Sequence, residues 1–94
     1  MKQYGNAIRE DKSQKINFLL IPVYCLRRLA LRFMLGASLH GANNWKGGNE
    51  EFKNGCMESA YRHLLSWIDG EQDEDHAFAT VWNIMVYEYL NNIK

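Results

Sequence analysis

The sequence predicts an all-α domain, a compact bundle of three main helices. Apolar residues recur at helical spacing over residues 22–40, 49–68 and 74–91. A glycine-rich stretch separates the first two patterns, and an acidic stretch separates the second from the third. A chain of 94 residues suffices for one domain with a small core. We therefore expect a single helical domain, with residues 1–15 as an N-terminal arm.

The first helix is expected to begin at Pro22, where the missing N–H of proline costs nothing. Its apolar residues form two stripes, so the helix needs cover on two sides. In a chain of three helices, we expect the second cover to come from another subunit. Gly41 ends the helix, because glycine readily takes the left-handed conformation that follows a helix end.

The second helix is expected to follow Asn49 as its cap, with Glu50 and Glu51 favouring the positive end of the helix dipole. The Asp69-Gly70 pair ends it. One stripe is predicted to face the core, and it consists of Phe52, Cys56, Ala60, Leu64 and Trp67. The third helix is apolar on most sides, which predicts that it is the central helix.

The formal net charge is zero, but the charge is unevenly distributed. Residues 1–40 carry seven Lys and Arg against two acids, and residues 41–94 carry four against nine. Duplex DNA binding needs a broad basic face, so we expect no duplex DNA partner. Oppositely charged halves can instead pair between subunits. Together with three Trp, five Tyr, four Phe and four Met, they predict a homo-oligomer.

No segment has the pattern of a targeting or membrane sequence. Residues 1–15 are polar, and the apolar run at 18–25 is too short for a signal peptide or a membrane span. Cys25 and Cys56 lack the spacing of metal ligands and are expected to be small buried residues in a reducing compartment. We expect a cytoplasmic protein without a membrane partner.

The stretch between the second and third helices gathers the most versatile chemistry. Residues 69–75 include five acids, and His63 and His76 lie on either side of them. Imidazoles and carboxylates can hold a divalent cation or order the groups around a phosphate. One hypothesis is an enzyme that uses Mg²⁺ to hydrolyse a nucleotide, with the metal held by Glu71, Asp73, Asp75 and His76. Its catalytic residues would be Glu71, Asp75 and His76. Acids before a helix also simply compensate its dipole.

A second hypothesis is a nucleotide-binding module that cleaves nothing. Trp45 or Trp67 would stack on the base, and Trp45 can alternatively act as a lid over the small core. Basic side chains would contact the phosphates, and the candidates are Arg28, Arg32, Lys46, Arg62 and His63. A third hypothesis is a protein-interaction subunit whose acidic loop docks on a partner.

Three blocks of the sequence together resemble a small phage-associated domain, which occurs alone and at the N-terminus of dATP/dGTP diphosphohydrolases. They are KSQKINFLLIP at 12–22, GASLHGANNWKGG at 36–48 and YRHLLSWIDGEQDEDHAFATVWN at 61–83. The similarity covers about residues 9–90. The family pattern usually has a further His in the last helix, and this chain has Ala79 and Thr80 in that region.

The resemblance implies nucleotide chemistry and a phage setting, in the cytoplasm of an infected bacterial host. In composite members a MazG-like catalytic module forms a separate segment, and this chain ends at Lys94 without one. The resemblance points to Asn44, Trp45, Arg62, His63, Glu71, Asp75, His76 and Asn83. We therefore expect, first, a phage-type protein that holds a nucleotide or cyclic oligonucleotide, such as a host-defence signal. The alternative is a Mg²⁺-dependent dATP/dGTP pyrophosphohydrolase.

Overall fold

The structure is a computed structural model that describes residues 2–9 and 15–92. Its elements in chain order are β1 (Lys2–Tyr4), β2 (Ala7–Arg9), η1 (Phe18–Leu20), α1 (Val23–His40), η2 (Asn44–Gly47), α2 (Glu50–Ile68) and α3 (His76–Asn92). The described part of the chain is mostly helical with three main helices, which confirms the predicted all-α class.

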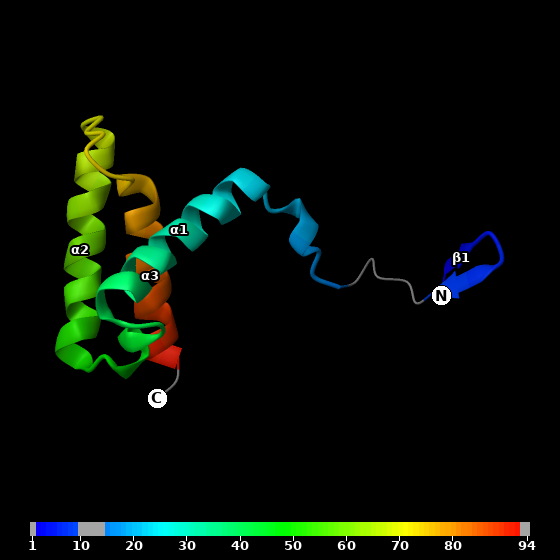
Figure 1. Cartoon of the computed structure of the whole chain (residues 1–94), viewed down its shortest axis with the longest axis horizontal. Helices are drawn as coiled ribbons and strands as arrows, with labels where there is room; N and C mark the ends of the chain where they lie inside the picture. Colours follow the sequence, from blue (N-terminus) through cyan, green and yellow to red (C-terminus); the bar gives the residue numbers. More distant parts are fainter. Residues whose placement is uncertain (1, 10–14, 93–94) are drawn as a thin grey trace.

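The N-terminal arm contains a hairpin that the sequence did not predict. Strands β1 and β2 pair antiparallel, and Gly5 has a φ of 59° in the turn between them, a conformation that glycine adopts without strain. The rest of the predicted arm includes residues 1 and 10–14, which lie outside the described residues. Figure 1 shows the hairpin well away from the three helices.

Helix ends are set by local hydrogen bonds. Pro22 has an extended ψ of 132°, so it precedes the helix and α1 begins one residue later than predicted. Gly41 has a φ of 92°, and its N–H donates to the carbonyl of Ala37 at 2.9 Å. At the start of α2, the side chain of Asn49 accepts from the N–H of Phe52 at 3.0 Å.

Helix α3 packs between α1 and α2, as its apolar pattern predicts. The core is small, and its buried apolar residues are Cys56, Ala60, Ala79, Val86 and Leu90. Burial raises the pKa of the Cys56 thiol, and Cys25 is only half-buried. The predicted core stripe on α2 is only partly correct: Cys56 and Ala60 are buried, but Leu64, Phe52 and Trp67 are 37%, 39% and 56% exposed. Within residues 2–9 and 15–92, α3 is the element that packs closely against α2, and the rest of the α2 surface is left without cover.

The chain is far from spherical. Its radius of gyration is 18.0 Å, whereas a compact chain of this length has about 12 Å. The N-terminal end of α1 and the segment before it project from the bundle (Figure 1). We call residues 16–21 the strap. Its apolar side chains are 49–93% exposed, with Leu19 at the upper limit.

No helix in the described residues combines the length and the hydrophobicity that crossing a bilayer would require.

Candidate functional site

A cavity of about 430 Å³ lies where the C-terminal end of α1, the η2 turn, α2 and α3 meet. Three aromatic rings line it, those of Trp45, Phe52 and Trp82. Trp45 is held in place by an edge-on contact with Tyr89, at 5.0 Å between ring centroids, and a tilted contact with Phe33 at 6.0 Å. Trp45 therefore both covers the core and lines the space, which we call the tryptophan cavity.

Two glycines, which have no side chain, create part of this space. Gly36 on α1 and Gly55 on α2 both line the tryptophan cavity, and a Cβ atom at either position would meet nothing within 4 Å. Glycine inside a helix costs about 1 kcal/mol relative to alanine. Both helices carry this cost at the wall of the cavity.

Polar groups also line part of the tryptophan cavity. Asn83 is buried, and its Nδ2 donates to the carbonyl of Ala79 at 2.8 Å. The Nε1–H of Trp82 is buried and has no acceptor among the described residues. Asn44, His40, Glu58 and Ser59 complete the polar lining. Aromatic walls with polar groups at separate points are typical of sites for small organic ligands.

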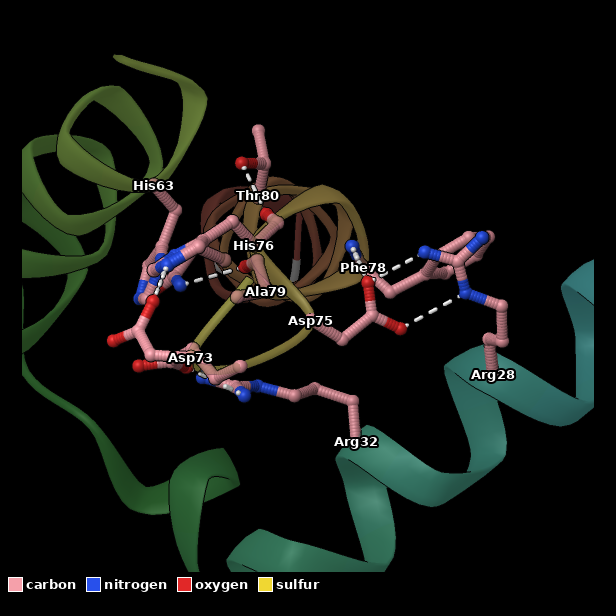
Figure 2. A network of polar contacts seen from close by, with 11 residues as sticks. Arg28, Arg32, His63, Asp73, Asp75, His76, Phe78, Ala79 and Thr80 are labelled. Atoms are coloured by element: carbon pink, nitrogen blue, oxygen red, sulfur yellow. Dashed lines mark hydrogen bonds and ion pairs between the residues drawn. The ribbon is translucent and has the colours of Figure 1, made fainter. Parts of the chain in front are cut away.

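A second group of polar residues lies at the turn between α2 and α3, around a pair of histidines (Figure 2). The Nδ1 atoms of His63 and His76 are 2.9 Å apart, and Nε2 of His76 is 2.7 Å from Oδ1 of Asp73. An ionised carboxylate only accepts, so Nε2 of His76 carries the shared proton and a neutral ring presents an unprotonated Nδ1 to His63. Burial lowers the pKa of His63, which favours its neutral ring. The hydrogen bond from His76 lowers the pKa of Asp73.

Two arginines of α1 hold this turn. Arg28 donates to both carboxylate oxygens of Asp75, at 2.9 and 2.6 Å, and Arg32 donates to Glu74 at 2.9 Å (Figure 2). The bidentate Arg28 contact lowers the pKa of the Asp75 carboxyl. Asp75 also caps α3, because its Oδ1 accepts from the N–H of Phe78 at 3.2 Å. This cap explains why α3 begins two residues after the predicted start.

A second cavity, of about 340 Å³, adjoins the turn, and we call it the acidic cavity. Glu71, Asp75 and His76, the predicted catalytic residues, all line it, together with Arg28 and Trp67. The fourth predicted metal ligand, Asp73, does not line this cavity. Asp73 contacts Nε2 of His76, and Arg28 donates to both carboxylate oxygens of Asp75.

Among the described residues, the group that could hold a metal ion consists of His63, Glu74 and His76. Of these, His76 belongs to the predicted metal ligands, His63 was expected to contact a phosphate, and Glu74 is absent from the predicted set. The sequence offers no signal to single it out, because five acids lie within seven residues and only the path of the turn decides which faces the histidines.

The remaining predicted ligand residues fall into separate places. Asn44, Trp45 and Asn83 share the tryptophan cavity, whereas Arg28 lines the acidic cavity. Lys46 lies over the rings of Trp45 and Tyr89, at 5.6 and 5.4 Å from their centroids. Within one chain, then, Arg28 and Trp45 do not share a cavity.

Arg62 is the predicted phosphate-binding arginine nearest to the tryptophan cavity. It is exposed and donates to Glu58 and Ser59, at 3.0 Å in each case. Both acceptors line the tryptophan cavity. Arg62 therefore lies at its rim.

These features define a small helical domain with a ligand-sized aromatic cavity and a histidine–carboxylate cluster at one turn. The chain belongs to the family described as dATP/dGTP diphosphohydrolase, N-terminal, whose model matches residues 5–94. No curated protein and no solved structure matches the chain at a significant level.

The contact between Arg28 and Asp75 predicts a measurable loss of stability when Asp75 is changed. Asp75→Ala removes both the cap and the ion pair and should cost about 2 kcal/mol, of which the cap supplies about 1. Asp75→Asn keeps a capping side chain and should cost only about half as much. Urea unfolding followed by circular dichroism measures both. Equal losses in the two variants would show that the cap contributes nothing.

Proposed function

We propose that this domain binds a purine nucleotide and holds its base in the tryptophan cavity. The observation that carries the proposal is the cavity itself, with Asn44, Trp45 and Asn83 on its wall. Its volume of about 430 Å³ falls within the range of roughly 300–1,000 Å³ found for small-molecule sites. The chain's membership of a family described by dATP and dGTP, two purine nucleotides, supports the same class of ligand.

The wall of the cavity suits a purine ring. The indoles of Trp45 and Trp82 offer apolar faces, and stacking a base on an aromatic ring contributes about 1–3 kcal/mol. The Nδ2 of Asn83 already donates to the backbone, while its Oδ1 accepts no bond from the described residues. That oxygen is therefore available to the exocyclic amine that adenine and guanine both carry.

Arg62 is the residue we assign to the phosphates. Its bond with Glu58 joins two exposed side chains four residues apart on one helix, and such pairs contribute less than about 1 kcal/mol. A phosphate is a stronger and bidentate acceptor, so it can displace this contact at the rim of the cavity. His40, at the C-terminal end of α1, lines the same cavity and can add a donor.

We propose that this domain binds its ligand without turnover. In the cytoplasm of a phage-infected host, a protein that holds a nucleotide or cyclic oligonucleotide would sequester it, including one that signals host defence. The lining supports a holding site, because among the described residues its ionisable groups, apart from the Cys56 thiol, are limited to His40 and Glu58.

Calorimetry with a ligand panel tests the binding function. We expect dATP, dGTP or a purine cyclic nucleotide to bind, and thymidine nucleotides to bind at least 10-fold more weakly. Trp45→Ala should weaken binding by about 10- to 100-fold, in line with the loss of one stacking surface. Trp67→Ala is the matched control, because Trp67 lines the acidic cavity instead. Absence of binding to the whole panel would favour the interaction-subunit hypothesis.

Nucleotide hydrolysis is the second candidate function, favoured by the meeting of Glu71, Asp75 and His76 around the acidic cavity. If Mg²⁺ acts there, wild-type protein should release pyrophosphate from dATP or dGTP, and Glu71→Gln should abolish that release. Glu71 is exposed, so its replacement should leave the melting temperature unchanged. Equal rates in wild type and Glu71→Gln would exclude Glu71 as a catalytic group.

We also propose that the domain functions as a homo-oligomer in which the strap of one copy covers apolar surface on another. Apolar patches of this extent rarely stay in contact with water in a soluble protein. Exposed apolar residues continue along α1, with Leu31 at 57% and Met34 at 63% exposure. The basic half of one chain and the acidic half of another provide complementary charge.

A further inference from the structure

We infer that His63, His76 and Glu74 form a binding site for one divalent transition-metal ion. One nitrogen of each ring and one oxygen of the carboxylate all lie within 4.8 Å of one another. His76 is buried, His63 is half-buried and Glu74 is exposed, so the cluster has a fixed inner side and an open outer side. The site is separate from the tryptophan cavity, and neither depends on the other for its ligand.

The arrangement of the two rings brings two possible ligand atoms together. Their Nδ1 atoms face each other at 2.9 Å, and Nδ1 of His76 is unprotonated when Nε2 donates to Asp73. An ion at about 2.1 Å from both nitrogens would subtend an angle of about 90°. That angle fits two neighbouring ligands of a six-coordinate or square-planar ion better than a tetrahedral one.

The residues that hydrogen-bond to the proposed ligands are of the kinds found around metal ligands in proteins. A metal-bound histidine usually donates its other ring N–H to a carboxylate, which fixes the ring, and Asp73 accepts that bond from His76 at 2.7 Å. Arg32 orients Glu74 in the same way, through a bond of 2.9 Å to one of its carboxylate oxygens. A carboxylate has several acceptor positions, so this bond leaves Glu74 able to bind an ion as well.

The donor set also indicates the class of ion. Two imidazoles and one carboxylate suit Mn²⁺, Fe²⁺, Co²⁺, Ni²⁺ or Zn²⁺, whereas Mg²⁺ prefers oxygen ligands. Asp75 lies outside the cluster of three ligands, and Arg28 engages both of its carboxylate oxygens. Three protein ligands leave coordination positions free. Since His76 and Glu74 both line the acidic cavity, an exchangeable ligand can reach the ion from there.

Zinc and cobalt titrations of chelator-treated protein test the inference. We expect one Zn²⁺ per chain by calorimetry, and a Co²⁺ absorption spectrum of low intensity, as six-coordinate sites give. His63→Gln and Glu74→Gln each remove one ligand. Loss of a residue that only hydrogen-bonds to a metal ligand weakens metal binding by roughly 10- to 100-fold, so loss of a ligand should weaken Zn²⁺ binding by at least this factor. Asp69→Asn is the matched control: it changes an exposed acid of the same turn outside the cluster, so Zn²⁺ affinity should stay within 2-fold of wild type.

Three results would overturn the inference. The first is no heat of binding with Zn²⁺ at millimolar concentration. The second is equal affinity in wild type and in both ligand variants, which would place the ion elsewhere on the chain. The third is a histidine ring ¹⁵N spectrum in which the proton between the two Nδ1 atoms persists in excess Zn²⁺. Far-ultraviolet circular dichroism of each metal-free variant establishes that the folds are equal.

Discussion

Replacing Gly55 with leucine is expected to abolish purine nucleotide binding while the folded protein becomes more stable. A side chain at this position enters the tryptophan cavity, where a Cβ atom meets nothing within 4 Å. The change also removes a glycine from the interior of α2, which contributes about 1 kcal/mol in favour of folding. Calorimetry with dATP or dGTP and thermal unfolding of the same sample measure the two effects together.

Gly55→Ala is the matched control for this change. A single methyl group gives the same gain in helix stability but fills little of a cavity of about 430 Å³, so binding should remain within a few-fold of wild type. If Gly55→Leu binds nucleotide as tightly as wild type, the base does not occupy this cavity. Zn²⁺ binding should be unaffected in both variants, because the histidine pair lies about 10 Å from Asn83 along α3.

Replacing Leu19 with serine is expected to dissociate the homo-oligomer. Leu19 is 93% exposed in the single chain, so the change should not lower the stability of the bundle itself. Burying one leucine contributes about 1.5–3 kcal/mol, and a symmetric dimer interface contains it twice. The dissociation constant should therefore rise by at least about 100-fold.

Size-exclusion chromatography with light scattering measures this prediction. Ile68→Ser is the control, since Ile68 is also exposed, at 65%, but belongs to the C-terminal end of α2 and not to the strap. A wild-type protein that is monomeric at high micromolar concentration would contradict the proposal. So would an equal loss of mass in both variants, because the strap would then have no special part in assembly.

Helix positions were largely predictable because their determinants are local. Asn49 bonds to Phe52 within one turn of backbone, and Gly41 ends α1 through a bond to Ala37. The departures have local causes as well: Pro22 is extended rather than helical, and Asp75 caps α3. The hairpin of β1 and β2 was missed because strands of three residues are too short to show a periodic pattern.

The site was predictable only as a set of residue types at one turn. His63 and His76 could be selected from the sequence as neighbours in space, because a short turn between antiparallel helices brings them to one end of the bundle. Their ring-to-ring contact, and the choice of Glu74 over the other four acids, depend on the path of that turn. Spacing along the chain contains no such information.

By itself, the sequence determined the helical class and most of the helix caps, because backbone hydrogen bonds and apolar periodicity act over a few residues, and it located the stretch in which the acids and two of the histidines gather. Only the tertiary structure decided that Arg28 binds Asp75, 47 residues away, and that Asn83 shares a cavity with Trp45. Those contacts depend on how three helices pack, and packing is settled by the shapes of side chains from all of them at once.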